Sequence, residues 1–365
     1  MGVRQLYEQT LAERGYQSDP AQLHALDSLE RCEREWEDYK ARRSNALTKL
    51  IARPPIPRGV YLWGGVGRGK SFLMDCFFTA LPLQRKTRLH FHEFMREVHR
   101  ELAEMQGTAD PLQHLGANIA RRFRLICLDE FHVADITDAM ILHRLLESLF
   151  ANRVSIVTTS NFPPDGLYPN GLHRERMLPA IELLKEQLEV VGVDGATDYR
   201  QATLQAVELY HTPLGPEADT AMNEAFERLA EAKDESPILK IEHREIRARR
   251  RAGGVVWFDF RQLCGGPRSQ NDYLEIATQF HTLLLSGVPQ MSPRLASESR
   301  RFTWLIDVLY DRRVKLIMSA AVEPEALYTE GPLVHEFPRT VSRLREMRSA
   351  GFLAEARRNV DTSLT

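Results

Sequence analysis

One short segment constrains the fold of this chain more than any other feature. Residues 64–71 read Gly-Gly-Val-Gly-Arg-Gly-Lys-Ser, which fits the pattern G-x-x-x-x-G-K-[ST]. An apolar, strand-like run (60–63) comes before it, and an apolar run compatible with a helix (72–78) follows. Glycines let the backbone turn tightly enough to aim N–H groups at phosphate oxygens, and the start of the helix adds partial positive charge. The segment therefore predicts a phosphate-binding loop, or P-loop.

The positions of the P-loop have distinct expected tasks. The Lys70 ammonium would reach the β- and γ-phosphates, and the Ser71 hydroxyl would complete the coordination of Mg²⁺. We therefore expect a nucleoside triphosphate and Mg²⁺ as ligands. The residues expected to contact the nucleotide here are Gly64, Gly65, Val66, Gly67, Arg68, Gly69, Lys70, Ser71 and Phe72.

The composition allows several domains and argues against some partners. With 365 residues, 43% of them apolar, the chain can form two or three hydrophobic cores. The formal net charge is −2, so no overall field attracts nucleic acid, and contact with a membrane would be peripheral at most. The four cysteines form no C-x-x-C pair, and the N-terminus lacks the apolar core of a signal peptide. These features predict a cytoplasmic protein.

The periodicity of apolar residues predicts an α/β fold in three regions. Residues 1–57 are charged and helix-periodic, whereas residues 58–200 alternate β-branched runs with helical stretches. Repeated strand–helix units predict a doubly wound parallel sheet with helices on both faces, the architecture of P-loop NTPases. Residues 201–365 form a further α/β region that ends in an amphipathic helix at 339–347. The polar segment 211–237 is expected to join two domains.

Two distant stretches of the sequence resemble each other. Residues 149–160 read Leu-Phe-Ala-Asn-Arg-Val-Ser-Ile-Val-Thr-Thr-Ser, and residues 309–320 read Leu-Tyr-Asp-Arg-Arg-Val-Lys-Leu-Ile-Met-Ser-Ala. A Leu-Tyr pair follows each stretch. A common type of helix-to-strand turn explains the likeness as well as an internal duplication would, so both explanations stay open.

Two carboxylates and an amide follow apolar runs downstream of the P-loop. Residues 125–130 read Leu-Ile-Cys-Leu-Asp-Glu, which places Asp129 and Glu130 at the end of a strand. There Asp129 can hold Mg²⁺ together with Ser71, and Glu130 can polarise the attacking water. Asn161 ends the next run, and its amide both donates and accepts, which suits it to orient that water. These residues predict hydrolysis of the nucleotide.

Two arginines lie further along the chain, in His173-Arg-Glu-Arg-Met-Leu-Pro. An arginine placed beyond that strand commonly points at the nucleotide of an adjacent subunit, where its charge stabilises the transition state. Arg174 and Arg176 are therefore both candidates for such an arginine finger. A solvated surface arginine is the alternative for either one.

With these residues in place, the whole chain resembles the ZapE-type, AFG-like branch of the AAA+ ATPases. Besides the P-loop, the likeness rests on His90-Phe-His-Glu-Phe-Met-Arg-Glu-Val-His and Cys127-Leu-Asp-Glu-Phe-His-Val-Ala-Asp-Ile-Thr-Asp-Ala-Met. It extends to Gly171-Leu-His-Arg-Glu-Arg-Met-Leu-Pro-Ala-Ile and to the segments 159–161, 193–200 and 339–347.

The resemblance implies a role for each part of the site. Residues 64–71 would be the Walker A motif, Asp129 and Glu130 the Walker B motif, and Asn161 the first sensor. It favours Arg176 over Arg174 as the finger, and it places a second, nucleotide-contacting sensor on Arg339 or Arg343. It also implies a helical lid within the C-terminal region, a homo-oligomeric and typically hexameric ring bound to ATP, and a protein substrate. For a bacterial member that substrate would belong to the cell-division machinery.

Three other groups of residues suggest weaker hypotheses. His90, His92, Glu93 and His99 resemble a metal set, but no second pair completes a tetrahedral site. Phe94 and Met95 are candidates for a loop facing a ring pore, with ordinary helix packing as the alternative. The basic run 244–251 would contact nucleic acid or acidic lipid, or would form a solvated strand or turn.

Three functions are compatible with these observations. The leading hypothesis is a ring-forming ATPase that remodels a protein partner. The alternatives are a nucleotide-dependent DNA-binding module of the helicase-loader kind, and a scaffold whose assembly is switched by ATP. A GTPase is disfavoured because the chain contains no Asn-Lys-x-Asp motif to read guanine.

Overall fold

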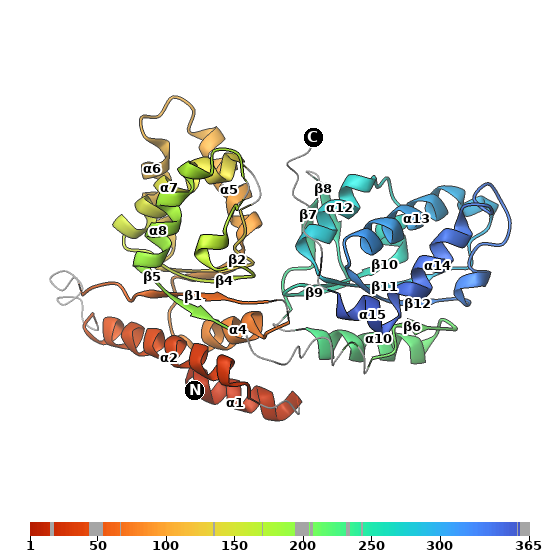
Figure 1. The fold of residues 1–365 in the computed structure, drawn as a ribbon, viewed down its shortest axis with the longest axis horizontal. Coiled ribbons are helices and arrows are strands. Elements are labelled where there is room, and N and C mark those ends of the chain that lie inside the picture. The colour runs from red at the N-terminus through yellow and green to blue at the C-terminus, as the bar shows by residue number, and fades with distance from the viewer. Residues whose placement is uncertain are drawn as a thin grey trace. The chain divides into compact units, whose positions relative to one another are not determined.

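The chain folds into two compact units. The computed structural model describes residues 1–14, 18–43, 54–65, 67–133, 136–169, 171–193, 204, 207–230, 234–241, 244–355 and 357. The first unit comprises Met1–Asp198 with Asp361–Thr365, and the second comprises Tyr199–Val360. Figure 1 labels most of the helices and strands of both units.

The first unit is built on a five-stranded parallel sheet. Its strands lie in the order β2-β3-β4-β1-β5. Their bounds are β1 Gly59–Trp63, β2 Lys86–His90, β3 Leu125–Asp129, β4 Ser155–Ser160 and β5 Leu188–Gly192. Since β1 lies beside β4 rather than β2, the chain crosses the sheet after the P-loop. This order confirms the doubly wound parallel sheet that the sequence predicts.

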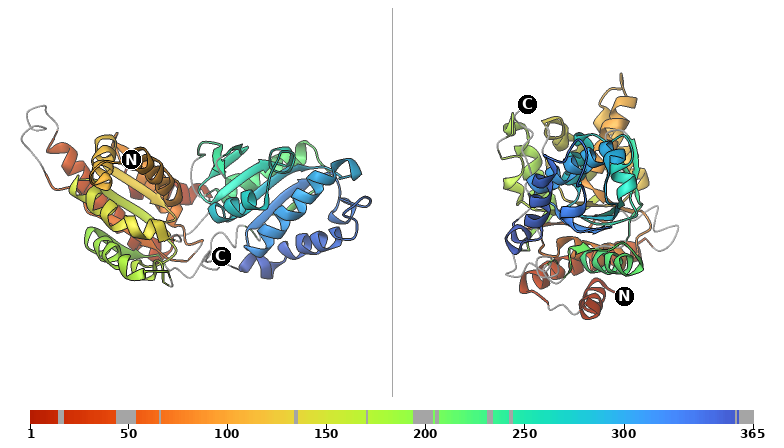
Figure 2. Two further views of the ribbon diagram at one scale, coloured as in Figure 1. Left: turned by 90° about the horizontal axis from the view of Figure 1, so that it is seen from above. Right: turned by 90° about the vertical axis from the view of Figure 1, so that its right-hand side faces the viewer.

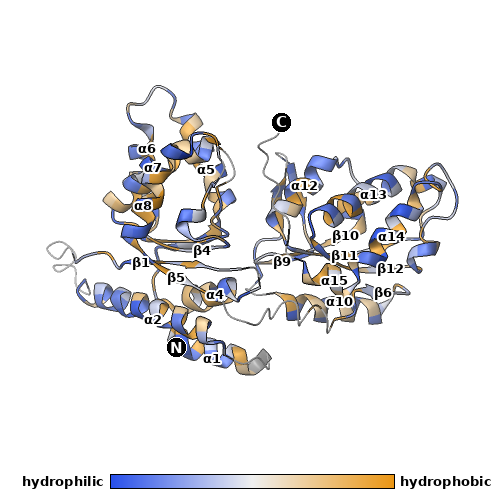
Figure 3. Ribbon diagram, in the orientation of Figure 1, coloured by the Kyte–Doolittle hydropathy of each residue, from blue (hydrophilic) through white to orange (hydrophobic). Residues whose placement is uncertain are grey.

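Helices cover both faces of this sheet, because side chains alternate along each strand. Tyr61 and Ile126 face a core shared with α5 to α8, whereas Val60, Leu62 and Cys127 face a core shared with α1, α2 and α4. The bounds are α1 Val3–Arg14, α2 Pro20–Ala41, α4 Lys70–Ala80, α5 Phe91–Glu104, α6 Pro111–Arg122, α7 Ile136–Ala151 and α8 Leu178–Gln187. Figure 3 shows these helices with apolar and polar stretches, as expected of helices that bury one side.

The start of α2 is fixed by its capping residue. Asp19 accepts a hydrogen bond from the backbone N of Ala21 over 2.8 Å, and Pro20 occupies the first turn. Aspartate is a favoured N-cap, and proline costs nothing at this position because its missing N–H would have no partner there. The cap determines where the helix meets the P-loop, which matters for the site described below.

The second unit contains another sheet, in the order β6-β12-β11-β10-β9. Only β9 runs antiparallel to its neighbour. The bounds are β6 Tyr210–His211, β9 Arg250–Ala252, β10 Val255–Asp259, β11 Thr282–Val288 and β12 Lys315–Ala320, and a separate hairpin joins β7 Ile238–Ile241 to β8 Arg244–Arg247. The helices are α10 Pro216–Leu229, α11 Phe260–Cys264, α12 Gln270–Gln279, α13 Ala296–Asp311, α14 Phe337–Met347 and α15 Ala350–Ala354. Figure 2 shows the unit from two further directions.

The polar segment 211–237 is not a simple connection between domains, which corrects our expectation. It contains the end of β6 and all of α10. Met222, Phe226 and Leu229 of α10 are buried against strands of the second sheet. The composition of the segment is polar because the outer face of α10 is acidic, although the inner face of the same helix is apolar and buried.

None of the helices in the described part of the chain combines the length and the apolar character that crossing a bilayer requires.

Candidate active site

The P-loop backbone has the conformation that its glycines predict. Gly67 and Gly69 have φ angles of 78° and 80°, in the left-handed region that favours glycine. A Cβ on Gly69 would also lie 2.5 Å from the side-chain nitrogen of Gln22. Gly69 directly precedes α4, so the loop delivers the chain to a helix N-terminus. Val66 lies outside the described residues.

The ammonium of Lys70 lies inside the loop. Its side chain is buried, and Nζ donates to the carbonyl oxygens of Gly64 and Gly65 over 2.8 and 2.7 Å. Nζ also donates to Oδ1 of Asn161 over 3.1 Å. A buried cation surrounded by neutral oxygens at a helix N-terminus fits an anionic phosphate. Lys70 and Asn161, 91 residues apart in sequence, are thus brought together.

The two carboxylates lie at the same edge of the sheet. Asp129 ends β3 and is buried, while Glu130 follows with a φ angle of 54°, which is unusual for a residue with a side chain. The backbone N of Glu130 donates to Oγ1 of Thr159 over 3.1 Å, and the same hydroxyl lies 3.4 Å from Oδ1 of Asp129. Thr159 of β4 therefore contacts both acidic residues, and its hydrogen bond stabilises the left-handed backbone at Glu130.

Sequence reasoning missed Arg88, which binds the carboxylate of Asp129, the candidate Walker B aspartate. Its guanidinium donates to Oδ2 of Asp129 over 2.6 Å, to Asp75 over 3.0 Å and to the carbonyl of Ser71 over 3.3 Å. Burial alone lowers the pKa of Arg88, but the charge and hydrogen bond of Asp129 outweigh burial and raise the pKa above its ordinary value. A charged residue inside a predicted strand was the available signal.

The N-terminal helices contact the P-loop through Gln22. The Gln22 side chain is buried, and its Nε2 donates to the carbonyl of Arg68 over 3.0 Å. Its Oε1 accepts from the hydroxyl of Tyr7 over 2.7 Å. The Tyr7 ring also lies against Phe72, with 5.4 Å between ring centroids. Both helices therefore belong to the site.

The two finger candidates lie on a short 3₁₀ turn, η2 (Arg174–Arg176), which packs against α7 and α8. Arg174 donates to the carbonyl of Asp165 over 2.9 Å. Arg176 lies 3.4 Å from the sulfur of Met140 and is exposed. Within the described part of the chain, the hydrogen bonds of these arginines do not reach the P-loop.

The second-sensor candidates lie on α14 of the second unit. Arg343 is largely buried, pairs with Asp307 and Asp311, and stacks over the Tyr310 ring at 4.7 Å. The side chain of Arg339 is 68% exposed and lies 3.8 Å from Asp307. The two arginines therefore differ in how firmly α13 holds them.

The suggested metal set and the suggested pore residues, Phe94 and Met95, have the following surroundings in the structure. His90 and His92 stack at 5.7 Å, but in the described part of the chain no group of three or more His, Cys, Asp or Glu residues is arranged to hold a metal ion. Phe94 and Met95 are buried in the core beneath α5, which supports ordinary helix packing rather than a pore loop.

Four of the five arginines in the basic run 244–251 pair with acidic neighbours. Its ion pairs join Arg244 to Asp272, Arg249 to Asp219 and Asp259, Arg250 to Glu227 and Asp234, and Arg251 to Glu235. Arginines paired in this way offer little net charge to a phosphate backbone.

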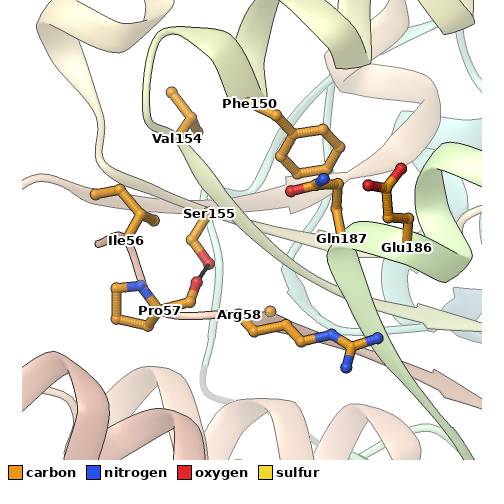
Figure 4. A pocket seen from close by; sticks show the side chains of 9 residues that line it. Ile56, Pro57, Arg58, Phe150, Val154, Ser155, Glu186 and Gln187 are labelled. Atoms are coloured by element: carbon orange, nitrogen blue, oxygen red, sulfur yellow. Dashed lines mark hydrogen bonds between the residues drawn. The ribbon is translucent and has the colours of Figure 1, made fainter.

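A pocket lies at the opposite edge of the first sheet, near the amino ends of β1 and β4. Ile56, Arg58 and Gln187 are among its lining residues, and Ser155 donates to the carbonyl of Pro57 over 2.9 Å (Figure 4). Because the P-loop and both carboxylates follow the carboxyl ends of their strands, this pocket is separate from the candidate active site.

Comparison with known proteins identifies close relatives. Residues 1–356 match the AFG1-like ATPase family. The chain is 41% identical to the cell division protein ZapE of Escherichia coli K12 over 360 residues, which is 95% of this chain and 96% of that protein. It is 37% identical to lactation elevated protein 1 homolog B of Danio rerio over 311 residues, or 81% of this chain and 62% of that protein.

The likeness to solved structures is slight. A putative primosome component from Streptococcus pyogenes matches 49% of this chain and 83% of its own, with 17% identity and a TM-score of 0.33. The PCH-2 protein of C. elegans matches 89% of this chain and 67% of its own, with 13% identity and a TM-score of 0.31.

Proposed function

This chain belongs to the AFG1-like ATPase family, and from that premise we propose that it is a ring-forming ATPase that remodels a protein partner in cell division. The observation that carries the proposal is the meeting of Lys70 with Asn161 beside the Asp129–Glu130 turn. A phosphate-binding cation, a water-orienting amide and a general base at one sheet edge form the set that phosphoryl transfer to water requires.

The residues of the first unit divide the work of hydrolysis. The P-loop N–H groups and Lys70 hold the phosphates, Glu130 polarises the attacking water, and Asn161 orients it. The left-handed backbone at Glu130 directs its carboxylate away from the line of the strand, and Thr159 keeps it so. Strained backbone of this kind is found where a side chain must be aimed.

Ser71 and Asp129 would hold Mg²⁺, since hydroxyl and carboxylate oxygens are the ligands this ion prefers. When bound, the ion supplies positive charge to the phosphate oxygens. Arg88 holds the Asp129 carboxylate in position at the carboxyl end of β3.

A ring would complete each site across a subunit interface, with Arg176 as the finger. Arg176 is exposed, and three apolar side chains near it in sequence or in space are exposed as well. Leu172 (67%) precedes η2, Leu178 (43%) begins α8, and Met140 (40%) of α7 lies against Arg176. Apolar residues gathered around an arginine are typical of a protein interface. Arg174, held by the carbonyl of Asp165, is the weaker candidate.

The neighbours of the basic run bear on the DNA-binding alternative. The acidic partners of Arg244, Arg249, Arg250 and Arg251 belong to the second unit itself, so this run lacks the unbalanced charge that steep salt-dependent DNA affinity needs. The name of the Escherichia coli relative supports a partner in cell division. We propose that the chain meets this partner in the cytoplasm.

A complementation experiment tests the ring directly. Lys70→Ala chains keep Arg176 but lose the nucleotide, and Arg176→Ala chains keep the nucleotide but lose the finger, so each alone should be inactive. In mixed rings an intact P-loop meets an intact Arg176, and part of the ATPase activity should return. Arg174→Ala, the matched control, should retain activity alone. Failure of the mixture to regain activity, with both variants assembled, would contradict completion of the site in trans.

A further inference from the structure

We infer that the second unit is a degenerate copy of the ATPase core of the first, which has kept the fold and lost the nucleotide site. Each chain would then bind a single nucleotide. The inference does not depend on ring formation or on the partner, and it stands on the topology, the register and the hydrogen bonds of the two units taken separately.

The two sheets have the same connectivity. In the first unit, β2, β3 and β4 lie side by side in chain order, and β1, the first strand of the unit, pairs with β4. In the second unit, β10, β11 and β12 lie side by side in chain order, and β6, the first strand of that unit, pairs with β12. The helix after the first strand, α4 or α10, packs on one face. The later helices, α5 to α8 or α11 to α14, pack on the other. A crossover of this complexity is seldom shared by chance.

The pairing register is the same as well. Tyr61 of β1 lies opposite Thr158 of β4, and Tyr210 of β6 lies opposite Met318 of β12, the position that matches Thr158. Each tyrosine hydroxyl donates to the backbone carbonyl that lies four residues beyond the residue paired with that tyrosine. The acceptor is Phe162 at 3.0 Å in the first unit and Val322 at 2.5 Å in the second.

The turns before and after the strands repeat too. Arg153 and Arg313, between helix and strand, both have left-handed backbones, with φ angles of 65° and 57°. Near the end of β11, where the pairing with β12 shifts its register, Gly287 takes the place of Glu130 and also has a left-handed backbone, with a φ angle of 73°. Its N donates to the hydroxyl of Ser319 over 3.1 Å, as Glu130 donates to Thr159. The likeness of residues 149–160 to 309–320 is thus one part of a repeated unit, which favours the duplication over a common turn.

The chemistry, in contrast, has not been kept. Ser286 and Gly287 stand where the first unit has Asp129 and Glu130, and Ala321 stands where it has Asn161. The connection from β6 to α10 spans only residues 212–215, whereas the P-loop spans 64–69. The first turn of α10 carries two acidic residues, Glu217 and Asp219, which repel phosphate at a helix N-terminus.

A side-chain cluster occupies the end of β11 in place of the acidic pair. The Ser286 hydroxyl donates to Asp259 over 2.7 Å and accepts from the indole N–H of Trp257 over 3.2 Å. Arg249 lies over the Trp257 ring at 4.5 Å and pairs with Asp259 at 3.6 Å. Arg249 also lies 3.8 Å from Asp219 at the start of α10. These contacts join β10 and β11 to the helix that would otherwise face the phosphates.

Nucleotide stoichiometry in the full chain tests the inference. Equilibrium dialysis with a radiolabelled, non-hydrolysable ATP analogue should give one nucleotide per chain, and Lys70→Ala should give none. Arg249→Ala, which opens the cluster of the second unit, should leave stoichiometry and affinity unchanged. Binding of one nucleotide per chain by Lys70→Ala would overturn the inference. Absence of binding by the parent chain would instead contradict the proposed ATPase site, so the two failures are distinguishable.

Discussion

Arg88 donates a hydrogen bond to Asp129 over 2.6 Å, and this short contact joins the edge strand β2 to the candidate Walker B carboxylate at the end of β3. The same guanidinium reaches Asp75 and the carbonyl of Ser71 on α4. One buried cation therefore holds together the helix that follows the P-loop and the aspartate expected to bind Mg²⁺.

Replacing Arg88 should damage both stability and turnover. Arg88→Met leaves the buried Asp129 carboxylate without its partner, which typically costs roughly 3–5 kcal/mol of unfolding free energy. Arg88→Lys, the matched control, keeps the charge but loses the planar fork, so it should be intermediate. Urea unfolding and steady-state ATPase measurements check this. Parental stability and turnover in Arg88→Met would show that the contact has no such role.

Gln22 should act on nucleotide affinity through the P-loop. Gln22→Ala removes the donor to the Arg68 carbonyl, and about tenfold weaker nucleotide binding is expected, the equivalent of one lost hydrogen bond of ~1.4 kcal/mol. Tyr7→Phe keeps Gln22 but frees its carbonyl, so the effect should be smaller. The dissociation constant of a fluorescent ATP analogue, with a melting curve for each variant, is the measurement. Unchanged affinity in Gln22→Ala would exclude this bracing role.

The two arginines of α14 should separate into a structural residue and an exposed one. Arg343→Ala loses ion pairs with Asp307 and Asp311, so its melting temperature should fall by several degrees. Arg339→Ala should leave the melting temperature unchanged because its side chain is largely exposed. If one of them is the second sensor, loss of turnover should follow Arg339. Loss of nucleotide affinity in Arg343→Ala at an unchanged melting temperature would reverse this assignment.

The buried thiols should make stability fall at alkaline pH. Burial raises the pKa of Cys32 and of Cys264 to about 12, whereas an unfolded thiol titrates near ~8.5. Below that value both states are protonated and nothing changes with pH. Above it, only the unfolded state loses the proton, so the free energy of unfolding falls progressively as pH rises towards 12.

Urea unfolding at pH 7.5 and 9.5 checks the thiol prediction, with Cys32→Ala and Cys264→Ala as controls that should reduce the pH dependence. Thiol labelling offers a second measurement, since all four cysteines are buried and free. Rapid labelling of Cys32 or Cys264 in the native chain at pH 8 would contradict their burial.

The nucleotide half of the site could be predicted from the sequence because its signals are local. The P-loop and the Asp129–Glu130 pair are short motifs whose neighbours also predict their strands and helices. The sheet of the first unit follows from the same alternation. The contacts of Arg88 and Gln22 could not be predicted, because their partners lie 41 and 46 residues away in the sequence and no local pattern identifies a partner at that distance.

The second unit gives weaker sequence signals than the first, for physical reasons. Its first strand, β6, consists of Tyr210–His211 alone, too short to give a periodic signal. The helix α10 appears acidic and polar because its apolar residues line only the inner face. The pairing register, in contrast, matches Tyr61 with Tyr210 and Glu130 with Gly287. The second unit lacks the phosphate-binding and acidic motifs by which a nucleotide site is recognised in a sequence.

The most direct test of the account is the turnover of Glu130→Gln. Glutamine keeps the size of the side chain but removes the base, so the variant should bind ATP as tightly as the parent chain and hydrolyse it at least about a hundredfold more slowly. Lys70→Ala, in contrast, should not bind nucleotide at all. The measurement is single-turnover hydrolysis of radiolabelled ATP alongside the dissociation constant for the same nucleotide. Equal hydrolysis rates in Glu130→Gln and the parent chain would contradict the assigned mechanism.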